Sequence, residues 1–467
     1  MNDIKKVAFL NPIMTLVTLS LAAIIMLLLF HFGNSNKQFA NFIEKSFIIG
    51  YFFSIPRVTQ VPFNQFHARI YMFPPIPEAT AINKILIIYV PIIIILLSRV
   101  NNFIKHSAVY LITCLILGNP FLLILHLITV LSTFWSDTPD VTLRASIILA
   151  ITHSFSIYLG KFNWQDLDGF MRWSGLAIAI LSLIKEPGKT QYILGITYAK
   201  NAIAGIMTIT AMLWLLYAIN YSKKRPMALV FFVIAMMTMQ FASSGGAKVV
   251  VILLITLALS TSFLKKLPFQ WAFTFVLVFF AFGTWFSILA IENWLSIIDS
   301  LGKDPTLTGR TIIWPQIINA WMNKNPWLGF GYGGFWQDWR GINNPANNIM
   351  GRYWKPPNGH NGFIDVGADV GYIGLIFLVL ALLKNIAMAV EYLGVNKKPE
   401  AALPLVLITF VFMRNLTESS LLVPSFEWFY FCMTSVQLSK DTIGQRLSGI
   451  PALTDKNNSR PEQVITE

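Results

Sequence analysis

Long apolar runs recur along almost the whole chain, and they restrict its fold more than any other feature. Hydrophobic residues make up 55% of the 467 positions and charged residues only 12%, about half the charged share of soluble domains. A helix that crosses a bilayer needs about 20 mostly apolar residues. The sequence therefore predicts an all-α, polytopic membrane protein with about 12 transmembrane helices. The expected spans are residues 11–31, 85–98, 108–134, 143–159, 170–184, 199–220, 227–242, 249–263, 269–290, 370–390, 403–413 and 425–438.

Two segments depart from this pattern near the start of the chain. Residues 32–84 mix proline, asparagine and aromatic residues, which indicates a loop with interfacial pieces on the side opposite the first residues. The apolar stretch 47–55 within them is too short to span. Asn119 and Pro120 interrupt the third expected span, which predicts a kink or two half-spans there.

Lysine and arginine cluster in short loops that all fall on one side of the predicted bundle. The positive-inside rule makes this side the cytoplasm, and both ends of the chain are expected there. We assign the net charge of +13 to this anchoring and to contact with anionic lipids or a phosphate-bearing substrate, not to nucleic acid. The clusters are Lys5/Lys6, Arg99/Lys105, Lys161, Lys223/Lys224/Arg225, Lys265/Lys266, Lys397/Lys398 and Lys440/Arg446.

One long polar interval, residues 291–369, separates N-terminal spans (1–290) from C-terminal spans (370–438), and a disordered cytoplasmic tail is expected at 439–467. The interval falls on the side opposite the basic loops, so we expect a large periplasmic loop containing short amphipathic helices. One such helix should begin near Arg310, because apolar residues follow it at helical spacing. Membrane spans alone do not require a loop this rich in cations, glycine and tryptophan, which indicates polar chemistry.

Five polar motifs occur where spans meet the outer side, and each contains a cation or a histidine. They are residues 198–201, 243–248, 308–310, 358–361 and 414–418. Arginine offers a planar fork to phosphate oxygens and lysine a point charge, and a helix N-terminus adds N–H donors. Fixed cations can stabilise a leaving diphosphate, and His360 could take the proton of an acceptor hydroxyl.

Structural roles compete with these functional interpretations. A single interfacial cation usually snorkels to the surface, and interfacial tryptophan and tyrosine usually belong to the aromatic belt rather than to a sugar platform. His126 and His153 fall inside expected spans and are interpreted as packed polar residues. The glycine-rich run 329–334 has no preceding strand, so we interpret it as a turn that brings the backbone close to something, not as a nucleotide loop. Both cysteines lie in apolar runs, so neither a disulfide framework nor a thiolate metal site is expected.

The motifs, taken in order, resemble the bacterial O-antigen ligase and polymerase superfamily of integral-membrane glycosyltransferases. The residues that carry the resemblance are Trp135, Ser136, Pro139, Asn201, Gly309, Arg310, Trp314, Pro326, Trp327, Leu328, Gly329, Gly331, His360, Asn361, Gly371, Gly374, Glu418 and Ser419. Residues 329–336 and 360–365 are most similar to the exopolysaccharide polymerization (ExoQ-like) branch. The resemblance implies transfer of a saccharide from an undecaprenyl-diphosphate donor, at the periplasmic face of the bacterial inner membrane, with inversion and without a metal or other cofactor. It also implies a saccharide acceptor, membrane lipids and a chain-length regulator as partners.

The resemblance further implies roles for individual residues. In the ligases two arginines contact the diphosphate and a histidine serves the acceptor, and Arg310 and His360 match one arginine and the histidine. Lys248 takes the place of the other arginine, although lysine cannot chelate two oxygens as arginine does. For Glu418, a structural pair with a neighbouring arginine is favoured over a role as second base. The further predicted substrate contacts are Arg414, Asn201, Asn361 and Glu418.

Three functions stay open at this point. A polymerase would join lipid-linked repeat units, and a ligase would move finished glycan to lipid A core or to a protein. The sequence does not separate these two, because the acceptor binds in the variable parts of the large loop. A transporter of the lipid-linked sugar is less favoured. Transporter sites lie near the bilayer midplane, whereas most charges here lie at the ends of spans.

Overall fold

The computed structural model describes residues 36–58, 118–186, 193–197, 199–300, 310–336 and 358–448. All regular elements within these ranges are helical, which confirms the predicted all-α fold. The α-helices are α3 (Lys37–Val58), α7 (Pro120–Leu131), α8 (Pro139–Leu159), α9 (Trp164–Lys185), α10 (Lys200–Asn220), α11 (Arg225–Phe241), α12 (Gly245–Leu264), α13 (Phe269–Ser300), α14 (Arg310–Lys324), α15 (Gly362–Val395), α16 (Leu403–Asn415) and α17 (Phe426–Ser448). Short 3-10 helices are η4 (Ser132–Phe134), η5 (Ser222–Lys224) and η9 (Pro399–Ala402).

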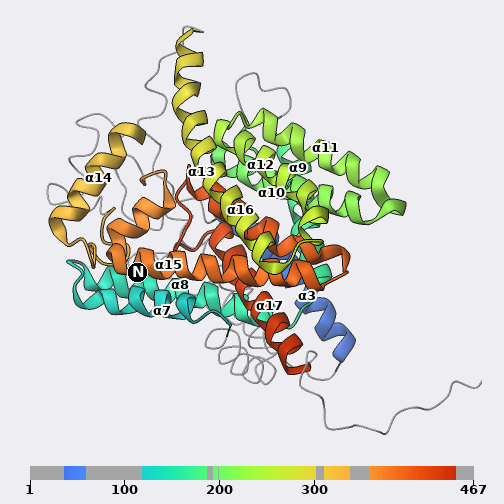
Figure 1. The fold of residues 1–467 in the computed structure, drawn as a ribbon, viewed down its shortest axis with the longest axis horizontal. Coiled ribbons are helices and arrows are strands. Elements are labelled where there is room, and N and C mark those ends of the chain that lie inside the picture. Colours follow the sequence, from blue (N-terminus) through green and yellow to red (C-terminus); the bar gives the residue numbers. More distant parts are fainter. Residues whose placement is uncertain are drawn as a thin grey trace, which may run out of the picture.

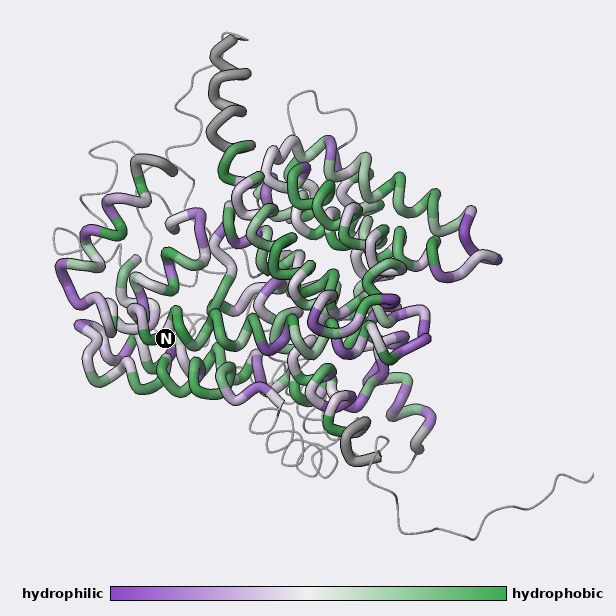
Figure 2. The backbone as a smooth tube through the Cα atoms, viewed as in Figure 1, coloured by the Kyte–Doolittle hydropathy of each residue, from purple (hydrophilic) through white to green (hydrophobic). Residues whose placement is uncertain are grey.

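Seven of the described helices are long and apolar enough to cross a membrane, namely α8 to α13 and α15. Figure 2 shows hydrophobic residues along most of their length. Large apolar side chains such as Leu259, Trp271 and Val278 are more than half exposed on the outside of the bundle, as lipid-facing positions require. The expected spans at 11–31 and 85–98 lie outside the described residues, so the total of twelve stays a prediction.

The helices form two groups, and α16 lies between them (Figure 1). In one group α10 packs against α9, α11 and α12, and in the other α15 packs along α7, which in turn contacts α8. The expected spans at 403–413 and 425–438 form α16 and α17. α16 contacts both groups, and α17 packs on α8, α15 and α16. α16 is too short to cross a bilayer by itself, and nearly all of its residues are buried inside the bundle.

Helix α3 corrects the prediction of a loop at this part of the chain. It packs on α9, and Ile48, Tyr51 and Phe52 are buried on one of its faces. A helix that lies against a bundle needs apolar residues only at every third or fourth position, so the shortness of the apolar run was misleading. The buried Glu44 accepts hydrogen bonds from Tyr158 and Lys161, which brings this end of α3 to the side predicted to be cytoplasmic.

The basic clusters within the described residues gather at one end of the bundle, as predicted. Lys440 Nζ donates to the carbonyl oxygen of Gly160 over 2.8 Å, beside Lys161. Tyr221, next to the cluster at 223–225, donates to Glu400, which follows the cluster at 397–398. α17 continues through this end to Ser448, so residues 439–448 are helical instead of part of a disordered tail.

Helix α15 is broken at Gly371, where φ is 68° and ψ is −170°. The turn after α14 docks on this break, because the N–H of Tyr372 donates to Pro326 O over 2.9 Å and that of Ile373 to Trp327 O over 3.2 Å. A Cβ added at Gly371 would lie 2.2 Å from the Trp327 backbone. The break therefore separates a short outer segment of α15 from its long apolar span, and it positions the outer segment.

Gly371→Ala is expected to lower the free energy of unfolding by at least about 2 kcal/mol, because alanine is disfavoured at this positive φ and its Cβ meets a backbone that cannot move aside. Gly394→Ala on the same helix is the matched control, since a Cβ there meets nothing within 4 Å. Thermal unfolding of the detergent-purified protein measures both variants. Equal melting temperatures would contradict the strain at the break.

Candidate functional site

The starts of several helices lie against residues 414–418, which are the end of α16 and the three residues that follow it. Arg414 Nη2 donates to the carbonyl oxygen of Asn201 at the start of α10 over 2.5 Å. At the start of α12, a Cβ added to Gly246 would lie 2.9 Å from Thr417 Oγ1. The predicted motifs at 198–201 (of which the structure describes 199–201), 243–248 and 414–418 therefore do meet at one end of the bundle.

The start of α15 reaches the same place. The N–H of Gly362 donates to Glu418 O over 3.0 Å, and that of Asn361 to Ser419 Oγ over 3.0 Å. Asn361 is the N-cap of α15, with its Oδ1 accepting from the N–H groups of Phe363 and Ile364. Both polar atoms of this side chain have partners within the fold, which gives Asn361 a structural role. Its predicted contact with substrate stays a prediction.

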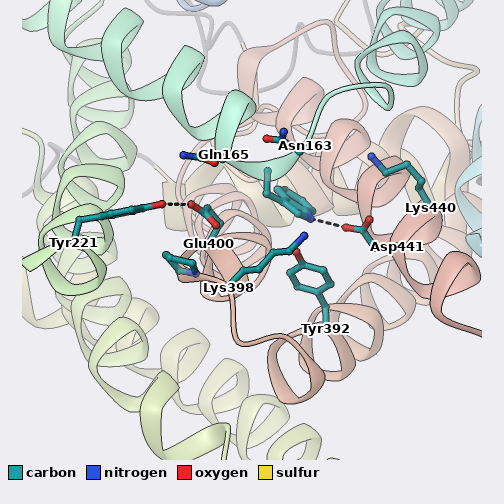
Figure 3. A pocket seen from close by; sticks show the side chains of 10 residues that line it. Asn163, Gln165, Tyr221, Tyr392, Lys398, Glu400, Lys440 and Asp441 are labelled. Atoms are coloured by element: carbon teal, nitrogen blue, oxygen red, sulfur yellow. Dashed lines mark hydrogen bonds between the residues drawn. The ribbon is translucent and has the colours of Figure 1, made fainter. Parts of the chain in front are cut away.

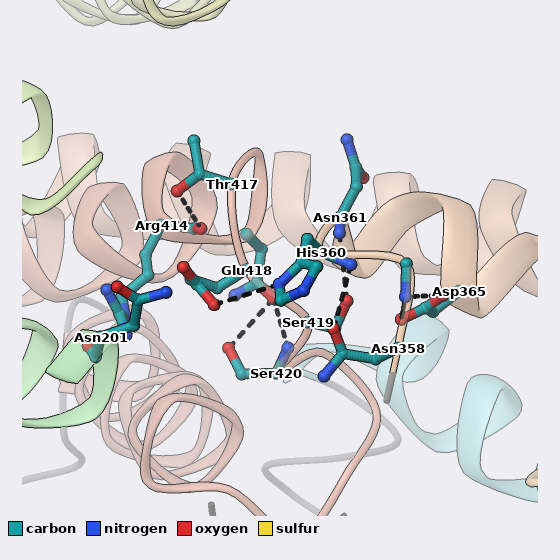
Figure 4. A network of polar contacts seen from close by, with 12 residues as sticks. Asn201, Asn358, His360, Asn361, Asp365, Arg414, Thr417, Glu418, Ser419 and Ser420 are labelled. Atoms are coloured by element: carbon teal, nitrogen blue, oxygen red, sulfur yellow. Dashed lines mark hydrogen bonds and ion pairs between the residues drawn. The ribbon is translucent and has the colours of Figure 1, made fainter. Parts of the chain in front are cut away.

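His360 directly precedes this cap and has a left-handed backbone with φ 50°. Its N–H donates to Asn358 Oδ1 over 3.0 Å. Its Nδ1 lies 3.7 Å from Glu418 Oε2, and the two side chains are 22% and 17% exposed. This distance is too long for a hydrogen bond but short enough for attraction when the imidazole is protonated. Figure 4 shows the two side chains facing each other beside Arg414 and Asn201.

The buried Asp365 carboxylate holds the backbone before His360. No role was predicted for it from the sequence. Asp365 accepts hydrogen bonds from the N–H of Gly359 over 3.0 Å and from Trp336 Nε1 over 3.2 Å. On the other side, Trp314 Nε1 of α14 donates to Gly359 O over 2.8 Å. Gly359 is thus fixed by α14 and α15 together. The signal was available, because an aspartate in the first turn of a helix faces the residues that precede it.

Helix α14 begins at Arg310, as predicted. Ile313 and Ile317 of the expected apolar face are buried. Trp314, which contacts Gly359, is one turn after Arg310, or about 6 Å along the helix axis. The start of α14 is therefore close to His360. The Arg310 side chain lies outside what the structure describes, and its role stays a prediction.

Lys248 lies in the first turn of α12, two residues after the close approach of Gly246 to Thr417. It is half-buried, and no carboxylate of the described residues lies within ion-pair distance of it. Its position supports the predicted convergence with the His360 motif. Its contact with substrate stays a prediction.

Arg414 is 4% exposed and has two partners within the fold. Its Nε donates to Glu427 Oε1 over 3.0 Å, and its Nη2 donates to Asn201 O. The favoured pairing of Arg414 with Glu418 is therefore wrong, and Arg414 supports the site through Glu427 and Asn201. Its predicted contact with substrate stays a prediction. The sequence did contain a signal for Glu427, since a carboxylate within an apolar run needs a charged partner. The predicted substrate contact of the Asn201 side chain stays untested.

Arg414→Met is expected to lower the free energy of unfolding by about 3–5 kcal/mol, because it leaves the buried Glu427 carboxylate uncompensated. The double variant Arg414→Met/Glu427→Gln should recover most of this loss, since neither charge is then buried alone. Unfolding in detergent measures both. If Arg414→Met instead keeps its stability but loses activity, that result would support a direct contact of Arg414 with substrate.

A cavity of about 340 Å³ opens at the opposite end of the bundle (Figure 3). Tyr221 and Glu400 line it, as do Trp164 and Asp441, whose Nε1 and Oδ2 are 2.9 Å apart. Burial and the hydrogen bond to Glu400 raise the pKa of the Tyr221 hydroxyl. Tyr221 follows the end of α10 and Asn201 is at its start, so about 30 Å of helix separates this cavity from His360. That length is the thickness of a bilayer core, and the two sites are distinct.

Residues 229–379 match the O-antigen ligase family. This range includes Lys248, α14 and His360 but ends before Glu418. Over 133 residues the chain is 30% identical to the exopolysaccharide production protein ExoQ of Rhizobium meliloti (strain 1021), and the match covers 27% of this chain and 30% of that relative. Residues 229–379 of this chain are therefore similar to the O-antigen ligase family.

Proposed function

We propose that this protein is an integral-membrane glycosyltransferase that polymerises undecaprenyl-diphosphate-linked oligosaccharide repeat units into exopolysaccharide or O-antigen. The observation that carries the proposal is the approach of His360 and Glu418 to 3.7 Å at the bundle end where α10, α12, α14 and α15 begin. The similarity to an exopolysaccharide production protein favours polymerisation over ligation. We place this end of the bundle at the periplasmic face of the inner membrane, because the basic loops lie at the other end.

In this proposal His360 acts as the general base. With Nδ1 facing Glu418, Nε2 takes the proton from the acceptor hydroxyl, and the Glu418 carboxylate stabilises the imidazolium that forms. The acceptor oxygen attacks the anomeric carbon of the donor while the bond from that carbon to the diphosphate oxygen breaks. The electron pair of that bond leaves with the diphosphate, and the configuration at the anomeric carbon inverts.

The departing diphosphate needs positive charge at this same end. Arg310 and Lys248 supply two fixed cations from the first turns of α14 and α12, and such groups act most strongly on charge that develops in the transition state. The N-termini of α10, α12 and α15 add partial positive charge. No step of this scheme requires a bound metal.

Reconstitution with one substrate tests the proposal. The purified protein in lipid nanodiscs is given only the lipid-linked repeat unit, and the products are resolved by length. A polymerase yields a ladder of lipid-linked chains, which the His360→Asn variant should not form. A product that arises only after lipid A core is added would support the ligase instead. In cells lacking the protein, repeat units trapped on the cytoplasmic leaflet would support a transporter.

A further inference from the structure

Three helices bring two histidines and a cysteine together inside the bundle, away from the His360 site. His126 belongs to α7, His153 to α8 and Cys432 to α17. Their potential ligand atoms all lie within 4.8 Å of one another, and the two imidazole centroids are 4.2 Å apart. His153 is 5% exposed and Cys432 is 1% exposed. From the sequence alone, both histidines are interpreted as packed polar residues, and no thiolate metal site is expected.

Packing alone leaves these side chains with unmet hydrogen-bonding capacity. His126 Nε2 and both ring nitrogens of His153 are buried without a hydrogen-bond partner among the described residues. Buried polar atoms almost always have a partner, and each one left without costs about 1–3 kcal/mol. In the neutral rings, His126 Nε2 and one nitrogen of His153 carry lone pairs, and these two call for a ligand that accepts electron pairs.

The hydrogen bond of His126 prepares it for that ligand. Its Nδ1 lies 2.8 Å from the carbonyl oxygen of Leu122. A carbonyl can only accept, so Nδ1 carries the proton and Nε2 is left with its lone pair. Metal-binding histidines are usually held in this way, with the second nitrogen donating to a backbone carbonyl or a carboxylate.

We propose that His126, His153 and Cys432 form a binding site for one Cu(I) ion. Imidazole and thiolate ligands suit both Cu(I) and Zn(II), and net charge decides between them. Cu(I) with one thiolate is neutral, whereas Zn(II) would leave one positive charge in the apolar interior, where an unpaired charge is costly. Binding releases the thiol proton to solvent. No carboxylate of the described residues belongs to the cluster to balance a divalent ion.

The ion would connect α7, α8 and α17. Cys432 follows Glu427 on α17 by five residues, or about 7.5 Å along the helix axis, and Glu427 is the partner of Arg414. The site is thus placed to stabilise the helix that supports the outer site without contacting the reacting atoms. It does not depend on the proposed glycosyltransferase activity.

Anaerobic titration of the full-length protein in detergent tests the site, with Cu(I) delivered from a colorimetric chelator. Wild-type protein should take up one equivalent, and Cys432→Ser and His153→Gln should bind at least about 100-fold more weakly. Thr434→Val, an isosteric change two residues along α17, is the matched control and should bind as the wild type does. X-ray absorption at the copper edge should show one sulfur and two nitrogen neighbours.

Three results would overturn the proposal. One is copper uptake by Cys432→Ser equal to that of the wild type. The second is absence of uptake by a wild-type sample that elutes as a single folded species. The third is one equivalent of Zn(II) held by wild-type protein that takes up no Cu(I), which would refute the charge argument.

Discussion

Replacing His360 by asparagine is expected to lower turnover by about 10²- to 10⁴-fold, the range typical for loss of a general base. Asparagine tolerates the left-handed backbone at this position (φ 50°), and its amide cannot take a proton. Abundance in the membrane and melting temperature should therefore stay close to those of the wild type. The measurement is the rate of chain extension by purified protein with a defined lipid-linked repeat unit.

Glu418→Gln tests whether the pair acts as a unit. Glu418 would act only through the imidazolium, so the double variant His360→Asn/Glu418→Gln should be no slower than His360→Asn alone. Asp140→Asn, which removes an exposed carboxylate at the start of α8, is the matched control and should be neutral. Multiplied losses in the double variant, or activity retained by His360→Asn, would contradict the proposed base.

The sequence predicted the apolar framework well because hydropathy is a local property. The expected span at 249–263 lies within α12. The expected span at 370–390 begins one residue before the break of α15 at Gly371. Helix α3 could not be predicted by the same rule. Its burial uses one face, and which face is buried depends on α9, a distant segment.

The sequence predicted individual residues of the candidate site, but not which of them interact with each other. His360 and Glu418 were both named, but their approach depends on how the start of α15 meets the end of α16. Arg414 pairs with Glu427 because α17 packs beside α16. Asp365 fixes Gly359 only because α14 and α15 meet there, and no local sequence pattern predicts that meeting.

Arg310→Met is expected to lower kcat/KM by about 10²- to 10³-fold, the loss typical when one fixed donor to developing negative charge is removed. Arg310 starts the helix whose next turn contacts Gly359. Lys324 ends the same helix, about 21 Å from Arg310 along the helix axis. It pairs with Asp137, and the two charged groups are 2.8 Å apart. Lys324→Met is therefore the matched control, and its effect should stay within about twofold because exposed ion pairs contribute little.

Lys248 gives the second half of this test, because the resemblance places an arginine where this chain has lysine. Lys248→Met should lower kcat/KM, whereas Lys248→Arg should retain or raise it, since guanidinium binds two phosphate oxygens at once. Direct binding of undecaprenyl diphosphate separates the cations from the base. Arg310→Met and Lys248→Met should weaken it, and His360→Asn should not. If Arg310→Met behaves like Lys324→Met in both assays, the diphosphate is held elsewhere, and the start of α14 serves only to position Gly359 beside His360.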